Sequence, residues 1–162
     1  MVSFLDLAQH NNIPLNAAKE LLDGMLQDQQ ETEVKTEAEL LRYCHAVAGT
    51  VGLMMCRILN CKQERADSFA IDLGIAMQLT NISRDVLEDA QMGRRYLPAN
   101  WFEQKVTIED IAQQSLQCKQ PVSDAIARLL SLSEQYYASA LLGIRLLPFR
   151  SRFAIAVALR VY

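Results

Sequence analysis

The amino-acid sequence predicts an all-α protein, and three observations support this fold class. Glycine and proline are scarce, at 6 and 4 of 162 residues, whereas β-sandwiches and barrels need many turn residues. Apolar residues recur at helical spacing along most of the chain, and no segment alternates in the way of a half-buried strand. There is no repeat and no low-complexity linker, so residues 1–162 are expected to form a single domain, a bundle of about six helices.

Helix boundaries are predicted from prolines and capping residues. Pro14 suits the first position of a helix. Thr36 and Glu39 have the spacing of a capping box, in which each side chain accepts from the other residue's backbone N–H, and Thr107 and Asp110 are spaced alike. From these signals, helices are expected to begin near Pro14, Thr36, Glu64, Thr107, Pro121 and Ser151, and the helix from Glu64 is expected to end at Gln91.

Composition limits the partners and the location of the protein. The formal net charge of −3 argues against a nucleic-acid partner bound through positive charge. The four cysteines lack Cys-x-x-Cys spacing and are expected to be reduced core thiols. The first residues lack the basic and apolar regions of a signal peptide, and no apolar run approaches the roughly 18 residues of a membrane span. A cytoplasmic location is therefore expected, with peripheral contact to a membrane left open.

A polar stripe runs along the helix expected over residues 64–91. At about 100° per residue, Gln78, Asn81, Asp85 and Asp89 fall within roughly 80° of one another. Solvated charges normally lie opposite to the core, but apolar residues border this stripe closely. These apolar neighbours are Ile75, Leu79, Ile82 and Val86. The stripe is therefore expected beside the core rather than on a solvated face.

Asp85 and Asp89 stand one helical turn apart, about 6 Å along the axis, so their charges repel. A bound divalent cation would neutralise them, because Mg²⁺ takes one or two carboxylates and completes its shell with water and phosphate oxygens. The two amides of the stripe would then add oxygens or hold the waters. Three nearby arginines, Arg84, Arg94 and Arg95, are the other source of positive charge. Arg94 and Arg95 lie just past the helix end and would suit a diphosphate. An ordinary surface helix with acidic and basic neighbours is the alternative.

Two glycines, Gly49 and Gly52, lie inside the helix expected over the apolar run 40–59, where each costs about 1 kcal/mol relative to alanine. Close packing of this helix on another is the favoured interpretation. The alternative is that a thin or kinked helix makes room for a bulky apolar ligand. The wall of such a cavity would come from Ala46, Val47, Ala48, Val51 and Leu53.

The glycines and the polar stripe belong to a longer pattern of three blocks. The blocks are Tyr43-Cys44-x-x-Val47-Ala48-Gly49-x-Val51-Gly52, then Gln78-Leu79-x-Asn81-Ile82-x-Arg84-Asp85-x-x-Glu88-Asp89, then Gly93-Arg94-x-Tyr96-Leu97-Pro98. In order and separation they resemble the squalene/phytoene synthase family of head-to-head prenyltransferases. Further similarity at residues 22–25 and 147–151 extends the resemblance over most of the chain, and residues 51–55 and 93–98 look most like bacterial phytoene synthases.

The resemblance implies a helical bundle of isoprenoid-synthase type that condenses two prenyl diphosphates, as in the conversion of geranylgeranyl diphosphate to phytoene in carotenoid biosynthesis. It implies Mg²⁺, with Mn²⁺ as a substitute, and no NADPH for phytoene; a squalene synthase, which uses NADPH, is the alternative. Carried onto this sequence, it makes Asp85, Asp89, Arg84 and Tyr43 the catalytic set and Asp85, Asp89 and Asn81 the metal ligands. It places Gln78, Asn81, Arg94 and Tyr96 around the diphosphate, and Val47, Ala48, Val51 and Gly52 in the wall of the prenyl cavity.

The sequence departs from the family pattern in one respect. The family has two aspartate-rich motifs, but no second Asp-x-x-x-Asp precedes Asp85. The 162-residue chain is therefore expected to be incomplete on its N-terminal side and inactive alone. An uncovered cavity wall is expected to favour self-association, and the nearly apolar segment 153–159 suggests that other protein packs there. A non-catalytic helical binding or assembly module stays open as a different class of function.

Overall fold

The computed structural model describes residues 3–28, 32–61 and 63–161. Its helices α1 to α8 are Phe4–Asn11, Leu15–Gln27, Glu37–Cys44, Thr50–Ile58, Ala66–Gln91, Ile108–Ala112, Lys119–Gly143 and Phe149–Val161. A π-helical turn, His45–Gly49, joins α3 to α4, and 3₁₀ turns are formed by Ala99–Trp101 and Ile144–Leu146. Two strands of two residues each, β1 (Thr32–Glu33) and β2 (Arg94–Arg95), are too short to give a period of two in the sequence. The predicted all-α class is confirmed.

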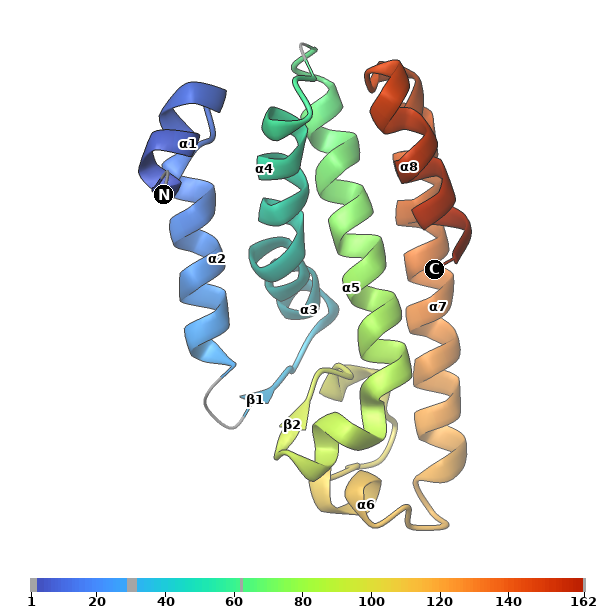
Figure 1. The fold of residues 1–162 in the computed structure, drawn as a ribbon. Coiled ribbons are helices and arrows are strands. Elements are labelled where there is room, and N and C mark those ends of the chain that lie inside the picture. The colour runs from blue at the N-terminus through green and yellow to red at the C-terminus, as the bar shows by residue number, and fades with distance from the viewer. Residues whose placement is uncertain (1–2, 29–31, 62, 162) are drawn as a thin grey trace.

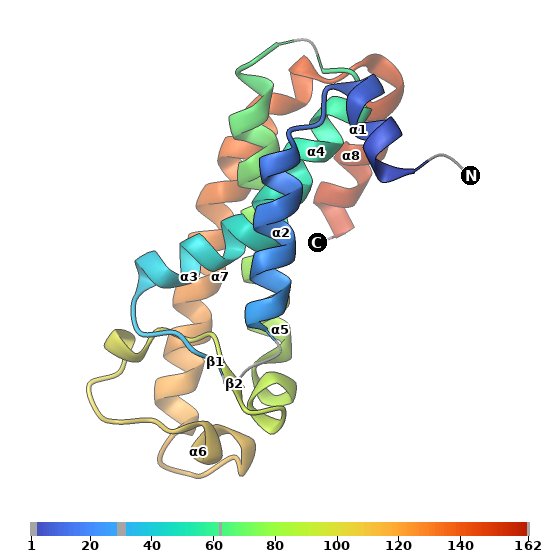
Figure 2. The same cartoon turned by 90° about the vertical axis from the view of Figure 1, so that its left-hand side faces the viewer.

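The two longest helices, α5 and α7, lie side by side and form the centre of the molecule, with α4 and then α2 on the other side of α5 (Figure 1). The strand pair and α6 lie at one end of the bundle, and α1 and α8 lie at the other (Figure 2). The main core fills the space where α3, α5 and α7 meet. Its buried members include Leu40, Ile75, Leu79, Ile82 and Leu129.

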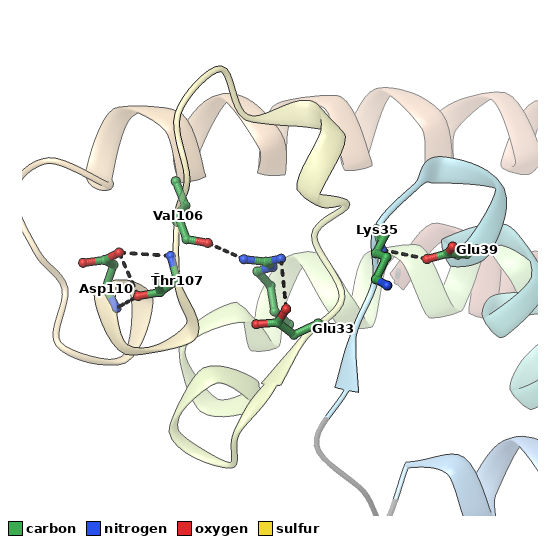
Figure 3. Close-up of polar contacts among 7 residues, drawn as sticks. Glu33, Lys35, Glu39, Val106, Thr107 and Asp110 are labelled. Carbon is green, nitrogen blue, oxygen red and sulfur yellow. Dashed lines mark hydrogen bonds and ion pairs between the residues drawn. The ribbon is translucent and has the colours of Figure 1, made fainter.

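Capping side chains begin two helices near the predicted positions. At α6, the Asp110 N–H donates to Thr107 Oγ1 at 3.1 Å and the Thr107 N–H donates to Asp110 Oδ2 at 3.0 Å, so the expected capping box is complete. At α3, the Glu39 N–H donates to Thr36 Oγ1 at 3.2 Å. The Glu39 carboxylate, however, accepts the N–H of Lys35 at 2.7 Å (Figure 3), so this second capping box is only half formed.

Two parts of the helix pattern differ from the prediction. Residues 40–59 do not form one helix, because the π-helical turn His45–Gly49 separates α3 from α4. The sequence signals considered above also missed α1. A capping box starts that helix, with the Asp6 N–H donating to Ser3 Oγ at 3.2 Å and the Ser3 N–H donating to Asp6 Oδ2 at 3.0 Å.

Glycines let the π-helical turn and α4 pack directly on the backbone of α5. A Cβ atom added at Gly52 would lie 2.0 Å from the Ala70 carbonyl oxygen, and one added at Gly74 would lie 2.2 Å from the Ala48 carbonyl oxygen. No side chain fits at such distances, because ordinary contact begins near 3.4 Å. For Gly52, close packing is therefore correct, and it fixes the position of the backbone that carries the candidate cavity wall.

The two strands tie the connection between α2 and α3 to the segment that follows α5, and they pair in parallel. Arg95 in β2 is buried, and its guanidinium group donates to the carbonyl of Val106 and lies 3.8 Å from a carboxylate oxygen of Glu33 (Figure 3). Arg94, the other residue of β2, is only partly buried.

Helix α8 leaves much of its apolar surface uncovered. Phe149, Phe153 and Val157 are 85%, 77% and 46% exposed, whereas Ile155 lines the cavity described below. The expectation that other protein packs on residues 153–159 stays a prediction, and the side chains of residues 158 and 159 lie outside the described part of the structure. Within the described part of the chain, no helix is both long enough and apolar enough to cross a membrane.

Candidate functional site

An apolar cavity of about 330 Å³ lies between α4, α5, the end of α7 and α8. This volume is within the range of sites that hold small molecules. The four residues expected in a prenyl cavity wall, Val47, Ala48, Val51 and Gly52, all line it, and they come from the π-helical turn and α4. The opposite side of the cavity comes from α5 and from the C-terminal part of the chain, with Phe69, Leu73, Met77, Ile144, Leu147 and Ile155.

Two amide side chains interrupt this apolar lining. They are Gln78 and Asn81, the first two members of the predicted polar stripe on α5. The Oδ1 atom of Asn81 is buried and accepts no hydrogen bond from any described residue. A buried acceptor without a donor costs roughly 1–3 kcal/mol, so this oxygen is available to a cation or to a water molecule that a ligand holds.

The stripe continues from the cavity toward the C-terminal end of α5. Asp85 and Asp89 follow Asn81 at steps of one helical turn, about 6 Å each. The bordering residues Ile75, Leu79 and Ile82 are buried. The stripe therefore lies beside the core, as expected from the sequence, and a ligand in the cavity would meet the amides first and the carboxylates beyond them.

Asp85 is held by its neighbour in the sequence. Arg84 donates from Nε to Oδ1 and from Nη2 to Oδ2, both at 2.7 Å. This hydrogen-bonded pairing keeps the pKa of Asp85 below its ordinary value. The Arg84 side chain is 64% exposed, and surface pairs of this kind contribute about 1 kcal/mol or less. A cation or an anionic ligand can therefore replace the pairing at little cost.

Asp89 has the opposite electrostatic environment. Burial, followed by repulsion from Asp85, raises its pKa to about 6. Asp28 and Glu88 add to this repulsion, and Arg94 acts against it without cancelling it. A half-buried carboxylate with a raised pKa needs positive charge, and a divalent cation at this position would remove the repulsion.

A third carboxylate, which the sequence did not reveal, lies close to the stripe. Asp28 directly follows α2, and its two oxygens accept hydrogen bonds at 2.7 Å from the hydroxyl groups of Tyr43 and Tyr96. The two tyrosine rings are stacked, with centroids 4.7 Å apart and planes inclined by 20°. No local signal in the sequence points to Asp28, because its partners are 15 and 68 residues away.

The two consecutive arginines of β2 have different roles. Arg94 is partly buried, and its charge acts on Asp89, so it lies close to the polar stripe, as a diphosphate partner should. Arg95 lines a small cavity together with Arg94 and Asp89, but its guanidinium group is buried, donates to the Val106 carbonyl and lies 3.8 Å from a carboxylate oxygen of Glu33. The burial of Arg95 and its bonds within the chain argue against the predicted contact with a diphosphate.

The donor set fits Mg²⁺. Within residues 3–28, 32–61 and 63–161, no three His, Cys, Asp or Glu side chains gather closely enough to hold a metal ion by themselves. Mg²⁺ does not need such a cage, since it is usually bound by one or two carboxylates together with water and phosphate oxygens. The uncompensated carboxylate of Asp89 and the orphaned amide oxygen of Asn81 are ligands of the right type.

A helical bundle with an apolar cavity that ends in two amides, with two aspartates further along the same helix, is the architecture of an isoprenoid synthase. The sequence model of the squalene/phytoene synthase family matches residues 1–162, and the chain belongs to this family. It is 43% identical to a 15-cis-phytoene synthase of Enterobacter agglomerans, an alignment that covers 99% of this chain and 54% of that protein.

Two solved structures share the fold. A squalene synthase from Alicyclobacillus acidocaldarius superposes with a TM-score of 0.84 at 22% identity, over 94% of this chain and 57% of that one. A dehydrosqualene synthase, solved in complex with a ligand, superposes with a TM-score of 0.77 at 31% identity, over 93% of this chain and 53% of that one. The chain thus spans about half the length of the relatives it matches.

Proposed function

We propose that this chain supplies one wall of the prenyl cavity and one metal-binding motif of a phytoene synthase, which joins two molecules of geranylgeranyl diphosphate head to head. The observation that supports this most strongly is the change of character along α5. Apolar residues of this helix line the cavity up to Met77, Gln78 and Asn81 form its polar end, and two aspartates follow. A ligand with a long apolar tail and an anionic head matches that order.

Each part of the site has a distinct task in this proposal. The apolar walls hold the prenyl chain and keep water from a carbocation. Asp85, Asp89 and Asn81 hold Mg²⁺, which, when bound, neutralises the charge of the departing diphosphate. Arg94 lies beside Asp89 and binds a diphosphate oxygen, and Arg84 exchanges its pairing with Asp85 for the same anion. Gln78 orients water or diphosphate oxygens at the polar end of the cavity.

Phytoene is favoured over squalene as the product because the most similar relatives are named phytoene synthases. Squalene formation would require NADPH. Product analysis of the complete gene product with geranylgeranyl or farnesyl diphosphate, with and without NADPH, distinguishes the two. For the 162-residue chain we propose binding without turnover, since the described residues provide a single aspartate-rich stripe.

Binding can be tested by thermal unfolding with geranylgeranyl thiodiphosphate, an unreactive substrate analogue. At a ligand concentration about 100 times Kd, binding stabilises a protein by about 2.7 kcal/mol, which corresponds to a rise in Tm of roughly 5–10 °C at this chain length. We expect this rise only when Mg²⁺ is also present. A rise of the same size without Mg²⁺ would contradict the metal role of the stripe.

Two variants make the binding test specific to the stripe. Asp89→Asn removes one carboxylate from the candidate metal site and should abolish the Mg²⁺-dependent part of the shift. Glu134→Gln removes one carboxylate from the exposed surface of α7 and should leave the shift unchanged. Equal shifts in both variants would show that the ligand binds elsewhere.

A further inference from the structure

Asp28 joins three segments that are far apart in the sequence. It follows the last turn of α2, while Tyr43 belongs to α3 and Tyr96 follows β2. The Tyr43 hydroxyl donates to Oδ2 and the Tyr96 hydroxyl donates to Oδ1, each at 2.7 Å. The ring stack holds the two hydroxyl groups next to each other, so one carboxylate serves both.

This arrangement fixes the direction of both phenol protons. A phenol has a single proton, and each of these protons is used in the bond to Asp28. Burial is the main cause that raises the pKa of both tyrosines. For Tyr43 the neighbouring Tyr96 hydroxyl and then Asp28 raise the pKa further, and for Tyr96 the effect of Asp28 opposes that of Tyr43, so both side chains stay neutral. Toward any other group, each tyrosine oxygen can only offer lone pairs.

The tyrosine pair lies close to the carboxylate end of the stripe. Asp28 acts on the charge of Asp89, and Asp89 acts on Tyr96. Tyr43 and Asp28 together line a separate cavity of about 500 Å³. The two hydroxyl groups are therefore near the carboxylates that are proposed to hold the metal.

We propose that Asp28 is a positioning residue that takes both hydroxyl protons of Tyr43 and Tyr96, so that these tyrosines act as hydrogen-bond acceptors and never as donors to a bound diphosphate. This inference rests on the proposed function for its ligand. Lone pairs repel an anion and attract positive charge, so in this proposal arginine and metal hold the diphosphate and the tyrosine oxygens do not.

A carboxylate is required for this task and an amide does not replace it. Ionised aspartate offers two acceptor oxygens, one for each tyrosine, whereas asparagine offers one oxygen and one NH₂ group. In the variant Asp28→Asn, one tyrosine would lose its acceptor and its proton would be free to turn toward the site. The substitution keeps the size of the side chain, which makes it the conservative test.

The experiment uses tyrosine labelled with ¹³C at Cζ, a carbon whose NMR shift responds to the hydrogen bonds of the phenol. The signals of Tyr43 and Tyr96 are assigned by their loss in Tyr43→Phe and Tyr96→Phe. We expect Asp28→Asn to move at least one of these two signals, and Asp23→Asn, at an exposed position of α2, to move neither. Unchanged signals in Asp28→Asn would overturn the proposal.

The second readout adds Mg²⁺ and inorganic pyrophosphate. In the unsubstituted protein, the two signals should keep the values of phenols that donate to Asp28, whereas in Asp28→Asn the freed phenol should respond to pyrophosphate. A wild-type shift that shows either hydroxyl turning from Asp28 to pyrophosphate would refute the proposal. If pyrophosphate does not bind, as ³¹P NMR would show, the proposed function fails, and the first readout still decides whether Asp28 positions the tyrosines.

Should Asp28→Asn fail to fold, the two phenylalanine variants provide the test. Each keeps the ring stack and removes one hydroxyl group. Because the two phenols bind different oxygens of Asp28, removing one should leave the signal of the other in place. A remaining tyrosine that leaves Asp28 and donates to pyrophosphate would contradict the inference.

Discussion

Replacing Gly74 by alanine tests the contact on which the geometry of the cavity depends. Gly74 lies in α5 and faces the carbonyl group of Ala48 in the π-helical turn. The new Cβ would lie 2.2 Å from that oxygen, about 1.2 Å closer than ordinary contact allows. The obstacle is backbone, so no side chain can rotate away, and α5 must separate from the π-helical turn.

The expected loss of stability follows from two opposing effects. Overpacking costs about 1–3 kcal/mol, and a collision with backbone belongs at the upper end of that range. Alanine regains about 1 kcal/mol over glycine through its helix propensity. The net loss is about 2 kcal/mol, which lowers Tm by roughly 4–8 °C for a chain of this length. Thermal and urea unfolding followed by circular dichroism measure both quantities.

Gly49→Ala is the matched control, because Gly49 lies in the π-helical turn that packs against Gly74. Its Cβ would meet only side chains, those of His45 and Ile71 at 3.2 Å, which need to yield by a few tenths of an ångström. We expect a change within about 1 kcal/mol of zero, because the gain in helix propensity offsets a small rearrangement. The reasoning is refuted if Gly74→Ala is as stable as the unsubstituted protein, or if both variants lose the same amount.

Four further predictions concern the site and its surroundings. The pKa of Asp89 is raised to about 6 in the folded protein, so the free energy of unfolding should fall as the pH rises from about 4 to 6. The affinity for Mg²⁺ should increase over the same pH range, because the metal binds the ionised carboxylate. Asp89→Asn should remove the first effect in pH-dependent unfolding and the second in calorimetry. Thr107→Ala removes a cap of α6 and should cost about 1 kcal/mol without changing ligand binding. Phe69→Ala enlarges the cavity and should shift relative affinity from geranylgeranyl to the longer geranylfarnesyl thiodiphosphate, as competition binding would show. Sedimentation velocity should show concentration-dependent self-association that Phe153→Ser weakens, and a monomer at all concentrations would argue against the role given to the exposed apolar surface.

The polar stripe was predictable because it depends on local periodicity alone. Once the helix over 64–91 is accepted, a rotation of about 100° per residue places Gln78 and Asn81 beside Ile75 and Leu79, and the structure has them there. The same holds for the capping box of α6, which Thr107 and its partner three residues later define locally.

Asp28 could not be found in this way, because its function depends on contacts across 15 and 68 residues of sequence. Nothing in its immediate neighbourhood shows that two tyrosines converge on it. The burial of Arg95 was missed for a related reason. The two arginines of β2 differ in burial and in their partners, and a strand of two residues leaves no periodic signal that would separate them.

The π-helical turn His45–Gly49 was missed because the apolar pattern of residues 40–59 is continuous. Inserting one wider turn does not change which residues are apolar, although it rotates the following residues relative to those before it. The turn packs closely against α5, where Gly74 meets the carbonyl of Ala48. That contact is tertiary, and helix propensity carries no record of it.

A crystal structure with Mn²⁺ and geranylgeranyl thiodiphosphate tests the central assignment most directly, because Mn²⁺ replaces Mg²⁺ and its anomalous scattering locates it. We predict a metal peak at Asp85 and Asp89, with the diphosphate toward Arg94 and the prenyl chain in the cavity lined by Val47 and Val51. A metal and a diphosphate bound away from this stripe, with Asp85 still paired to Arg84 and the cavity vacant, would contradict the assignment.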